Sequence, residues 1–332
     1  MQVVALLPTS RPTHLARSDD AMIWWVQESE QGQEAAFALG ADGVPRATAL
    51  TAGRVLAALD LVSSPAVRAS GNFHSLAAGP DGRVWFYFAG GAGRRAASCV
   101  GTFDARDGAI RIVVNDTQLA SATGMGRSLV LARGTLIARG DDLSLWVRHS
   151  DAAGLFRIDP NSGGVLRPFD TVTTQSGERL TLTRPDLAMG AAPDGLLLLD
   201  PGRVELWRID SAGRAFSLHT LVGLPTFLSA PSADATGRAF LVAADAPLIP
   251  ARTDEEAHQV LPVRYPALLI IESGKLRAIG RDDMTAPEGF ALPEMRVQQL
   301  LADPQTQSLI GYDEKSGALV RFRLVNNPVT VP

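Results

Sequence analysis

The sequence predicts an all-β fold, namely a six-bladed β-propeller built from four-stranded antiparallel blades. Three observations predict it. A strand-turn-strand pattern recurs at a fixed spacing, most copies are followed by a second hairpin turn, and no window shows a long apolar period of 3.6 residues. A four-stranded blade needs two hairpins, and the radial repetition of blades leaves few free sheet edges.

The repeat is clearest at Trp24, Trp85 and Trp146, because 85 − 24 = 61 and 146 − 85 = 61. An aspartate stands four residues before each tryptophan, so the match covers a turn and the strand after it. Looser copies follow at Met189–Leu196, Asp234–Phe240 and Leu301–Ile310. Second hairpin turns are predicted where Gly can adopt the positive φ of a tight turn, at Asp42-Gly43, Asp107-Gly108, Ser162-Gly163, Ala212-Gly213 and Ser273-Gly274.

These units place the blades in one domain that covers residues 1–332. The blades are expected near 9–50, 73–115, 128–170, 186–221, 227–281 and 296–325. A strand at residues 3–7 is expected to complete the last blade and close the ring, with Val329–Val331 as the competing assignment. Two segments exceed what a blade needs, Thr117–Arg127 and Asp245–Pro266. Each is either a binding loop on a rigid scaffold or a plain surface excursion.

Charge and cysteine content narrow the class of protein. The net charge of −4 comes without a basic run, so we expect no nucleic-acid partner. No apolar stretch has the length of a membrane span, and the first residues lack a positive region before their apolar run. The single cysteine, Cys99, cannot form an internal disulfide, which fits a reducing compartment. A cytoplasmic location is therefore expected.

Two segments resemble the blade motifs of known propellers. His74–Phe86 and Leu155–Gly163 look like blades of NHL-type and streptogramin-lyase-like propellers, and the whole chain has the rhythm of the gluconolactonase-like superfamily. The resemblance implies a propeller fold. The catalytic signatures of those families do not carry over. Thr13–Ala16 lacks the first acidic metal ligand of gluconolactonase-like enzymes, and His258 stands alone where a lyase site would want paired His and a Glu.

The innermost strand of each blade lines the central channel, so residues just before the repeat are candidates for a ligand site. The predicted channel-lining residues form a mixed polar ring rather than a metal cage, and we expect neither a metal nor another cofactor. These candidates are Thr13, Arg17, His74, Thr135, Arg139 and Gln298, with Gln299 as the alternative to Gln298. His14, His74 and Asp186 are the candidates for proton transfer if the channel is catalytic.

Most of the noticeable residues have a structural explanation. Asp20, Asp81, Asp142 and Asp194 are expected to stabilise turns, because Asp bonds its own backbone two residues on. The repeated tryptophans are expected to fill the space between blades, and Cys99 to be a buried, inert thiol. His14 and His74 fit a structural or merely solvated role better than a ligand or proton-transfer role.

The sequence therefore favours a non-catalytic propeller that presents a rigid face to a protein partner, as a binding or scaffolding subunit of a larger assembly. A small-molecule hydrolase or lyase acting in the central channel is the second hypothesis. A component of a phage particle or secretion apparatus is the third. A small-molecule ligand in the channel is compatible with the first hypothesis as well as the second.

Overall fold

The described strands of this chain form six sheets, which we present from a computed structural model. The residues described are 2–8, 13–17, 22–28, 33–40, 43–61, 69–79, 82–92, 95–123, 134–139, 142–148, 153–159, 161–169, 171–174, 176–181, 188–192, 195–200, 205–210, 214–220, 229–243, 266–286, 296–303, 308–313 and 317–324.

The sheets follow one another along the chain. The first sheet contains β2 (Thr13–Arg17), β3 (Ile23–Glu28), β4 (Glu34–Leu39) and β5 (Pro45–Thr51). The second contains β6 (Ala69–Ala78), β7 (Arg83–Ala92), β8 (Arg95–Asp104) and β9 (Ile110–Asn115). The third contains β10 (Gly134–Arg139), β11 (Asp142–Arg148), β12 (Ala153–Ile158) and β13 (Val165–Phe169).

The fourth sheet contains β16 (Ala188–Ala192), β17 (Gly195–Asp200), β18 (Glu205–Asp210) and β19 (Arg214–Thr220), with β14 (Thr171–Thr174) and β15 (Arg179–Thr181) added at its edge. The fifth contains β20 (Ser232–Ala233), β21 (Ala239–Ala243), β22 (Ala267–Glu272) and β23 (Lys275–Gly280). The sixth contains β24 (Val297–Asp303), β25 (Ser308–Asp313), β26 (Ala318–Arg323) and β1 (Gln2–Pro8).

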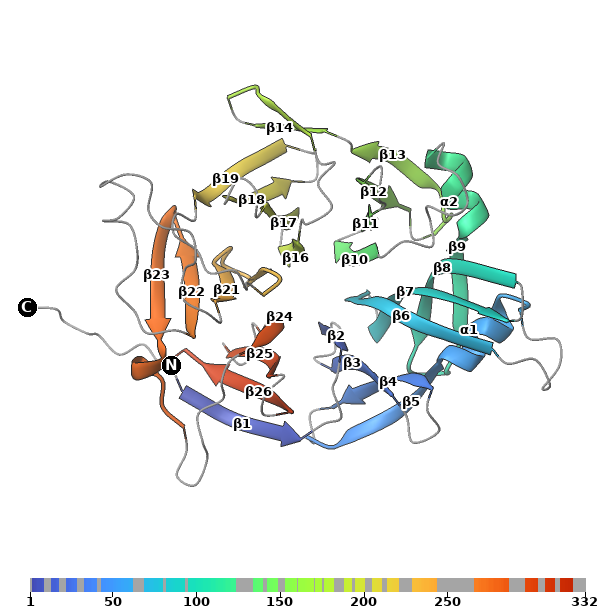
Figure 1. Ribbon diagram of the computed structural model, residues 1–332, viewed down its shortest axis with the longest axis horizontal. Coiled ribbons are helices and arrows are strands. Elements are labelled where there is room, and N and C mark those ends of the chain that lie inside the picture. The colour runs from blue at the N-terminus through green and yellow to red at the C-terminus, as the bar shows by residue number, and fades with distance from the viewer. Residues whose placement is uncertain are drawn as a thin grey trace, which may run out of the picture.

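The first strands of the sheets surround a central axis (Figure 1). In order around the axis they are β2, β6, β10, β16, β20 and β24, each contacts the next, and β24 contacts β2 again. The chain ends meet in the sixth sheet, where β1 pairs antiparallel with β26 from Gln2 opposite Arg323 to Pro8 opposite Ala318. The all-β propeller fold and the closing role of the N-terminal strand are thus confirmed. The competing segment, Val329–Val331, lies outside the described residues.

One expectation fails in the fourth sheet. Five sheets have four antiparallel strands, but the fourth has six, and β14 runs parallel to β19. The cause is local: Thr171–Thr174 and Arg179–Thr181 pair as a short hairpin, and β14 then pairs with the outer edge of β19 at Thr173 and Thr174. An outer strand offers unpaired backbone groups to such an addition.

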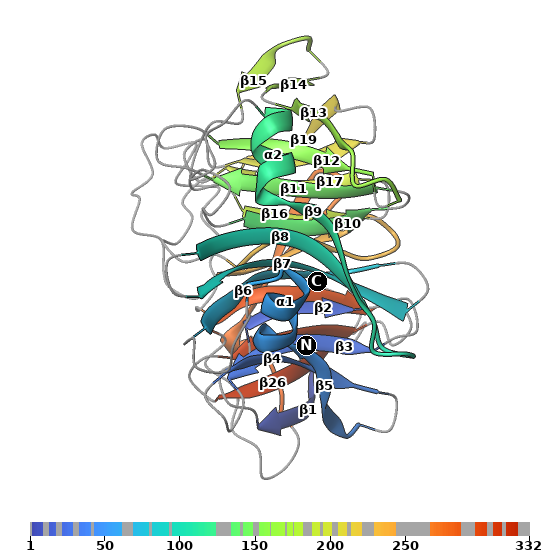
Figure 2. The same ribbon diagram turned by 90° about the vertical axis from the view of Figure 1, so that its right-hand side faces the viewer.

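Two short helices lie on the outer rim of the ring beside the second sheet, and the later one also contacts the third sheet (Figure 2). The first, α1 (Ala52–Ala58), starts at Thr51, whose hydroxyl accepts the Arg54 N–H. The second, α2 (Asp116–Thr123), covers part of Thr117–Arg127, for which the sequence predicted only a loop. It starts with a capping box, since Asn115 and Gln118 each accept the other's backbone N–H. A single 3-10 turn, η2 (Arg281–Asp283), follows β23. No helix among the described residues is long and apolar enough to cross a membrane.

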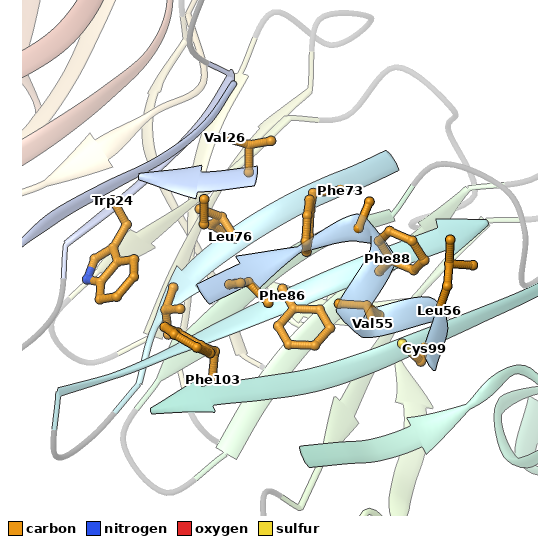
Figure 3. Packing of buried hydrophobic residues seen from close by; sticks show 14 of the residues in the cluster. Trp24, Val26, Val55, Leu56, Phe73, Leu76, Phe86, Phe88, Cys99 and Phe103 are labelled. Atoms are coloured by element: carbon orange, nitrogen blue, oxygen red, sulfur yellow. The ribbon is translucent and has the colours of Figure 1, made fainter. Parts of the chain in front are cut away.

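The core lies between neighbouring sheets. Trp24 is fully buried, and its ring meets the edge of Phe103 from the second sheet at 6.0 Å and 79° (Figure 3). Trp85 is buried in a cluster that reaches Ile158 in the third sheet. The packing role predicted for these two tryptophans is confirmed. Trp146 lies in β11, but its side chain is outside the described residues.

Four of the five predicted second-hairpin turns have the expected backbone, and the fifth, Ala212-Gly213, lies outside the described residues. Gly43, Gly108, Gly163 and Gly274 all have φ between +70° and +75°. In two of these turns an aspartate four residues earlier accepts the Gly N–H through its carbonyl, as Asp104 does for Gly108 and Asp159 for Gly163, both at 2.9 Å. The Arg106 side chain also bonds the Asp104 carboxylate, which lowers the pKa of that carboxyl. These aspartates differ from the predicted ones. Asp20, Asp81 and Asp194 lie outside the described residues, and the Asp142 side chain is not described.

Gly108 and Gly163 provide a matched test of how closely the third sheet approaches the second. A Cβ on Gly108 would have no neighbour nearer than 3.9 Å, whereas one on Gly163 would overlap the carbonyl oxygen of Val113 in β9. We expect Gly108→Ala to cost about 1 kcal/mol through the positive φ alone, and Gly163→Ala about 2 kcal/mol. Equilibrium urea unfolding measures both values. Equal costs for the two variants would contradict this approach of the sheets.

Candidate functional site

The innermost strands of the first and second sheets each carry a β-bulge at a histidine. In β2, the register shifts between Thr13 and Ala16, so His14 and Leu15 together oppose one residue of β3. In β6, it shifts between Phe73 and Ser75, which makes His74 the extra residue. A bulge redirects a side chain away from the alternation of a regular strand. Since β2 and β6 are neighbours around the axis, the two bulges lie beside each other.

His14 has an unusual backbone as well as a bulge. Its φ is 54°, in the left-handed region that a residue with a Cβ rarely adopts. Its imidazole hydrogen-bonds the backbone of Phe73, and it is the donor because the bond favours the protonated ring. Burial, and after it the nearby charge of His74, nevertheless lower the pKa of His14 to about 4. His14 is therefore a neutral imidazole at neutral pH.

Glu34, at the start of β4, holds the same backbone segment from the other side. Its Oε2 accepts the Phe73 N–H at 2.6 Å. Burial raises the pKa of Glu34, and the neighbouring charge of Glu28 adds to that rise, while the bond from Phe73 opposes it. Phe73 thus has its backbone bonded to two ionisable side chains of the first sheet. We call His14, Glu34, Phe73 and His74 the bulge site.

The His74 side chain contacts a residue of the neighbouring strand in its own sheet. Its ring lies 5.8 Å from the ring of Tyr87 in β7, at an interplanar angle of 47°. His14, Glu34 and His74 are each partly exposed, whereas Tyr87 and the Phe73 side chain are buried. The bulge site therefore has a buried floor and polar groups that solvent can reach.

A third bulge lies on the other side of β2, in β24 of the sixth sheet, where Gln298 and Gln299 together oppose one residue. The Gln299 amide joins the sheets, since it donates to the Leu15 carbonyl at 2.8 Å and accepts the Leu15 N–H at 2.9 Å. Farther along the same strands, Arg17 pairs with Asp303 at 3.2 Å. The main chain beside His14 is thus fixed from both neighbouring sheets.

The structure distributes the predicted site residues unevenly. Thr13, Thr135, Arg139 and Gln298 lie in the innermost strands β2, β10 and β24, but their side chains are outside the described residues. Asp186 is outside them altogether, as is nearly all of the insertion Asp245–Pro266. His14 and His74 come together. Arg17 does not join them, because its guanidinium is paired with Asp303.

Sequence reasoning missed Glu34 and Tyr87, and it gave Gln299 only as the alternative to Gln298. Glu34 stands in no repeat position, and only its contact with Phe73 marks it. Tyr87 follows the repeated Trp85 by two residues, so alternation along the strand predicts that both share a face. In the part of the chain that is described, no group of three His, Cys, Asp or Glu side chains is placed to hold a metal ion.

Cys99 does not belong to the bulge site. It is fully buried in β8, and burial followed by the charge of Asp116 raises the pKa of its thiol. We expect the folded protein to leave a thiol reagent such as Ellman's reagent unreacted over hours, because the thiolate is the reactive form. The same protein in denaturant is expected to react fully within minutes. Prompt reaction of the folded protein would contradict the burial of Cys99.

Comparisons with known proteins find similar solved structures but no matching family or curated sequence. Similar solved structures include an oligogalacturonate lyase in complex with manganese, at 13% identity and a TM-score of 0.49, covering 93% of this chain and 76% of that one. Another is a putative glucose dehydrogenase from Thermus thermophilus, at 14% identity and a TM-score of 0.47, covering 96% and 99%. The β-propeller domain of the Trilobed protease from Pyrococcus furiosus has 10% identity and a TM-score of 0.47, covering 93% and 79%.

Proposed function

We propose that this propeller binds a small polar molecule at the bulge site. One observation carries the proposal: two bulges in neighbouring innermost strands bring His14, His74 and Glu34 to a single backbone segment, Phe73. Bulges cost ladder hydrogen bonds and are common next to functional sites. The positive φ of His14 is a further cost that the fold maintains at the same place.

The chemistry of the bulge site favours a ligand that donates hydrogen bonds. A neutral imidazole has one donor and one acceptor nitrogen, and His14 uses its donor on Phe73. Glu34 accepts the Phe73 N–H with one carboxyl oxygen, and its second oxygen is another acceptor. Hydroxyl groups and amide N–H groups match these acceptors. The ligand class we propose is therefore a small molecule rich in hydroxyl or amide donors.

A binding screen with matched histidine variants tests this proposal. The probes are a set of small polyols, amino alcohols and primary amides, detected by ligand-observed NMR on the full chain. At least one probe is expected to bind, and His14→Asn and His74→Ala are expected to weaken its binding at least tenfold. Asn suits the left-handed backbone at position 14. His219→Gln, in the outer strand β19, is the control and is expected to bind like the parent. An absence of binding, or equal binding by all variants, would overturn the proposal.

A second candidate is proton-transfer chemistry at the same place, as a hydrolase or lyase. The observation in its favour is that two ionisable groups with perturbed pKa values bond the same backbone segment, since burial lowers the pKa of His14 and raises that of Glu34. If this candidate holds, a screen of lactones and esters is expected to find a turnover that His14→Asn abolishes and His219→Gln retains. Failure of a broad screen would rule it out.

We also propose that residues 1–332 form a single propeller domain with six blades, of the NHL-type or gluconolactonase-like kind. The location that we propose is cytoplasmic. The six described sheets support the blade count. A protein partner on one face of the ring stays a prediction, which pull-down from the native host tests. A monomer that retains no partner would count against it.

A further inference from the structure

A row of polar side chains crosses the second sheet, starting at the partly exposed His74 and continuing through buried residues. The row runs from His74 in β6 to Tyr87 in β7, whose hydroxyl shares a hydrogen bond with Ser98 in β8. Tyr87 lies opposite Val100 and Ser98 opposite Ala89, so the two are diagonal neighbours on one face. Neither has any exposed surface. The row therefore leads from the bulge site into the protein interior.

Asp116 ends the row at the rim. It is the first residue of α2 and only 3% exposed, and its charge helps to raise the pKa values of both Tyr87 and Cys99. The reciprocal bonds between Asn115 and Gln118 fix where α2 starts, and so fix Asp116. The start of α2 is thereby tied to the region around the Tyr87 hydroxyl.

Packing alone does not require these polar groups. The same side of the sheet carries an apolar cluster that includes Trp85, Val100, Val114 and Ile158. A phenylalanine in place of Tyr87 would fill nearly the same volume without a buried hydroxyl. Burying hydroxyl and carboxyl groups in such a cluster costs free energy unless they are hydrogen-bonded. Once they are hydrogen-bonded, these groups restrict the orientation of the Tyr87 ring more than apolar contacts would.

We propose that Tyr87 is a positioning residue for His74, held in place by its hydrogen bond to Ser98 and surrounded by the field of the buried Asp116. This inference rests on the proposed function of the bulge site. Because His74 is the extra residue of a bulge, it has no residue directly opposite it in β7. The Tyr87 ring is the contact that the neighbouring strand provides instead. Fixing that ring fixes the orientation in which His74 faces His14 and Phe73.

The test is NMR of the His74 imidazole in the full chain without ligand. Tyr87→Phe and Ser98→Ala are expected to split or broaden the His74 Cε1–H signal, which is expected to be a single narrow line in the parent protein. Asp116→Asn, a milder change, is expected to broaden the His74 Cε1–H signal to a smaller extent. Val84→Ala is the matched control. Val84 is also fully buried in β7, but it belongs to the cluster on the opposite face of the sheet.

The control is expected to lower the melting temperature and leave the His74 signal unchanged. If Tyr87→Phe and Ser98→Ala fold and leave the His74 signal as narrow as in the parent protein, the positioning role is wrong. If either fails to fold, Asp116→Asn decides by the same criterion. This readout needs no ligand, so it separates failure of the positioning role from failure of the proposed function, which only the binding screen detects.

Discussion

Trp24→Ala is expected to destabilise the fold by about 3–5 kcal/mol, the usual cost of truncating a fully buried tryptophan. The indole joins the first sheet to the second through its edge contact with Phe103 and the surrounding cluster. Removing it leaves a cavity between two blades that other side chains have little room to fill, because Val26, Phe86 and Phe103 around it are themselves buried. Equilibrium urea unfolding measures the loss.

Val44→Ala is the matched control, since Val44 is 50% exposed and its truncation is expected to change stability by less than about 0.5 kcal/mol. Trp24→Phe, which keeps an aromatic ring, is expected to fall between the two. A cost for Trp24→Ala no larger than that for Val44→Ala would contradict the packing of the first sheet on the second.

The second large effect is on the pH dependence of stability. The unfolded chain protonates His14 near pH 6.5, whereas the folded protein does so near pH 4, mainly because burial penalises the charged ring. Between these values the unfolded state binds the extra proton, so stability is present above pH 6.5 and falls as the pH is lowered. The full loss is on the order of 3 kcal/mol, and about 2 kcal/mol of it falls between pH 7 and pH 5.

His14→Asn isolates this contribution. The raised pKa of Glu34 has the opposite effect on the pH dependence of stability, since the folded state binds that proton more tightly. Unfolding of the parent protein alone therefore measures only the sum of the His14 and Glu34 contributions. Urea unfolding of the parent and of His14→Asn at pH 7 and pH 5 gives the difference that belongs to His14. The parent is expected to lose about 2 kcal/mol more than the variant. Equal losses would show that the fold does not lower the pKa of His14 as described.

Much of the scaffold could be predicted because it depends on short-range patterns. The repeat at Trp24 and Trp85 marks a position between sheets, and both side chains are buried there. The predicted turns at Gly108, Gly163 and Gly274 depend only on the backbone freedom of glycine, which the sequence shows directly. Closure by the N-terminal strand followed from the missing strand of the last unit.

The bulge site could not be predicted in the same way. A bulge is a mismatch between two strands, so nothing in Thr13–Arg17 alone shows that His14 is displaced from its partner in β3. The contact from Glu34 to Phe73 joins residues of two different sheets, and no short-range pattern connects them. The short α2 was missed for a related reason, since its eight residues carry almost no apolar period and its start depends on the capping of Asn115 by Gln118.

A pH titration of the His14 imidazole by NMR, combined with cross-relaxation from its ring protons, tests the bulge site most directly. We expect a pKa of about 4 for His14, with contacts from its ring to Phe73 in the neighbouring innermost strand. A His14 that titrates near 6.5, without contacts to Phe73, would contradict the bulge site and the function proposed for it.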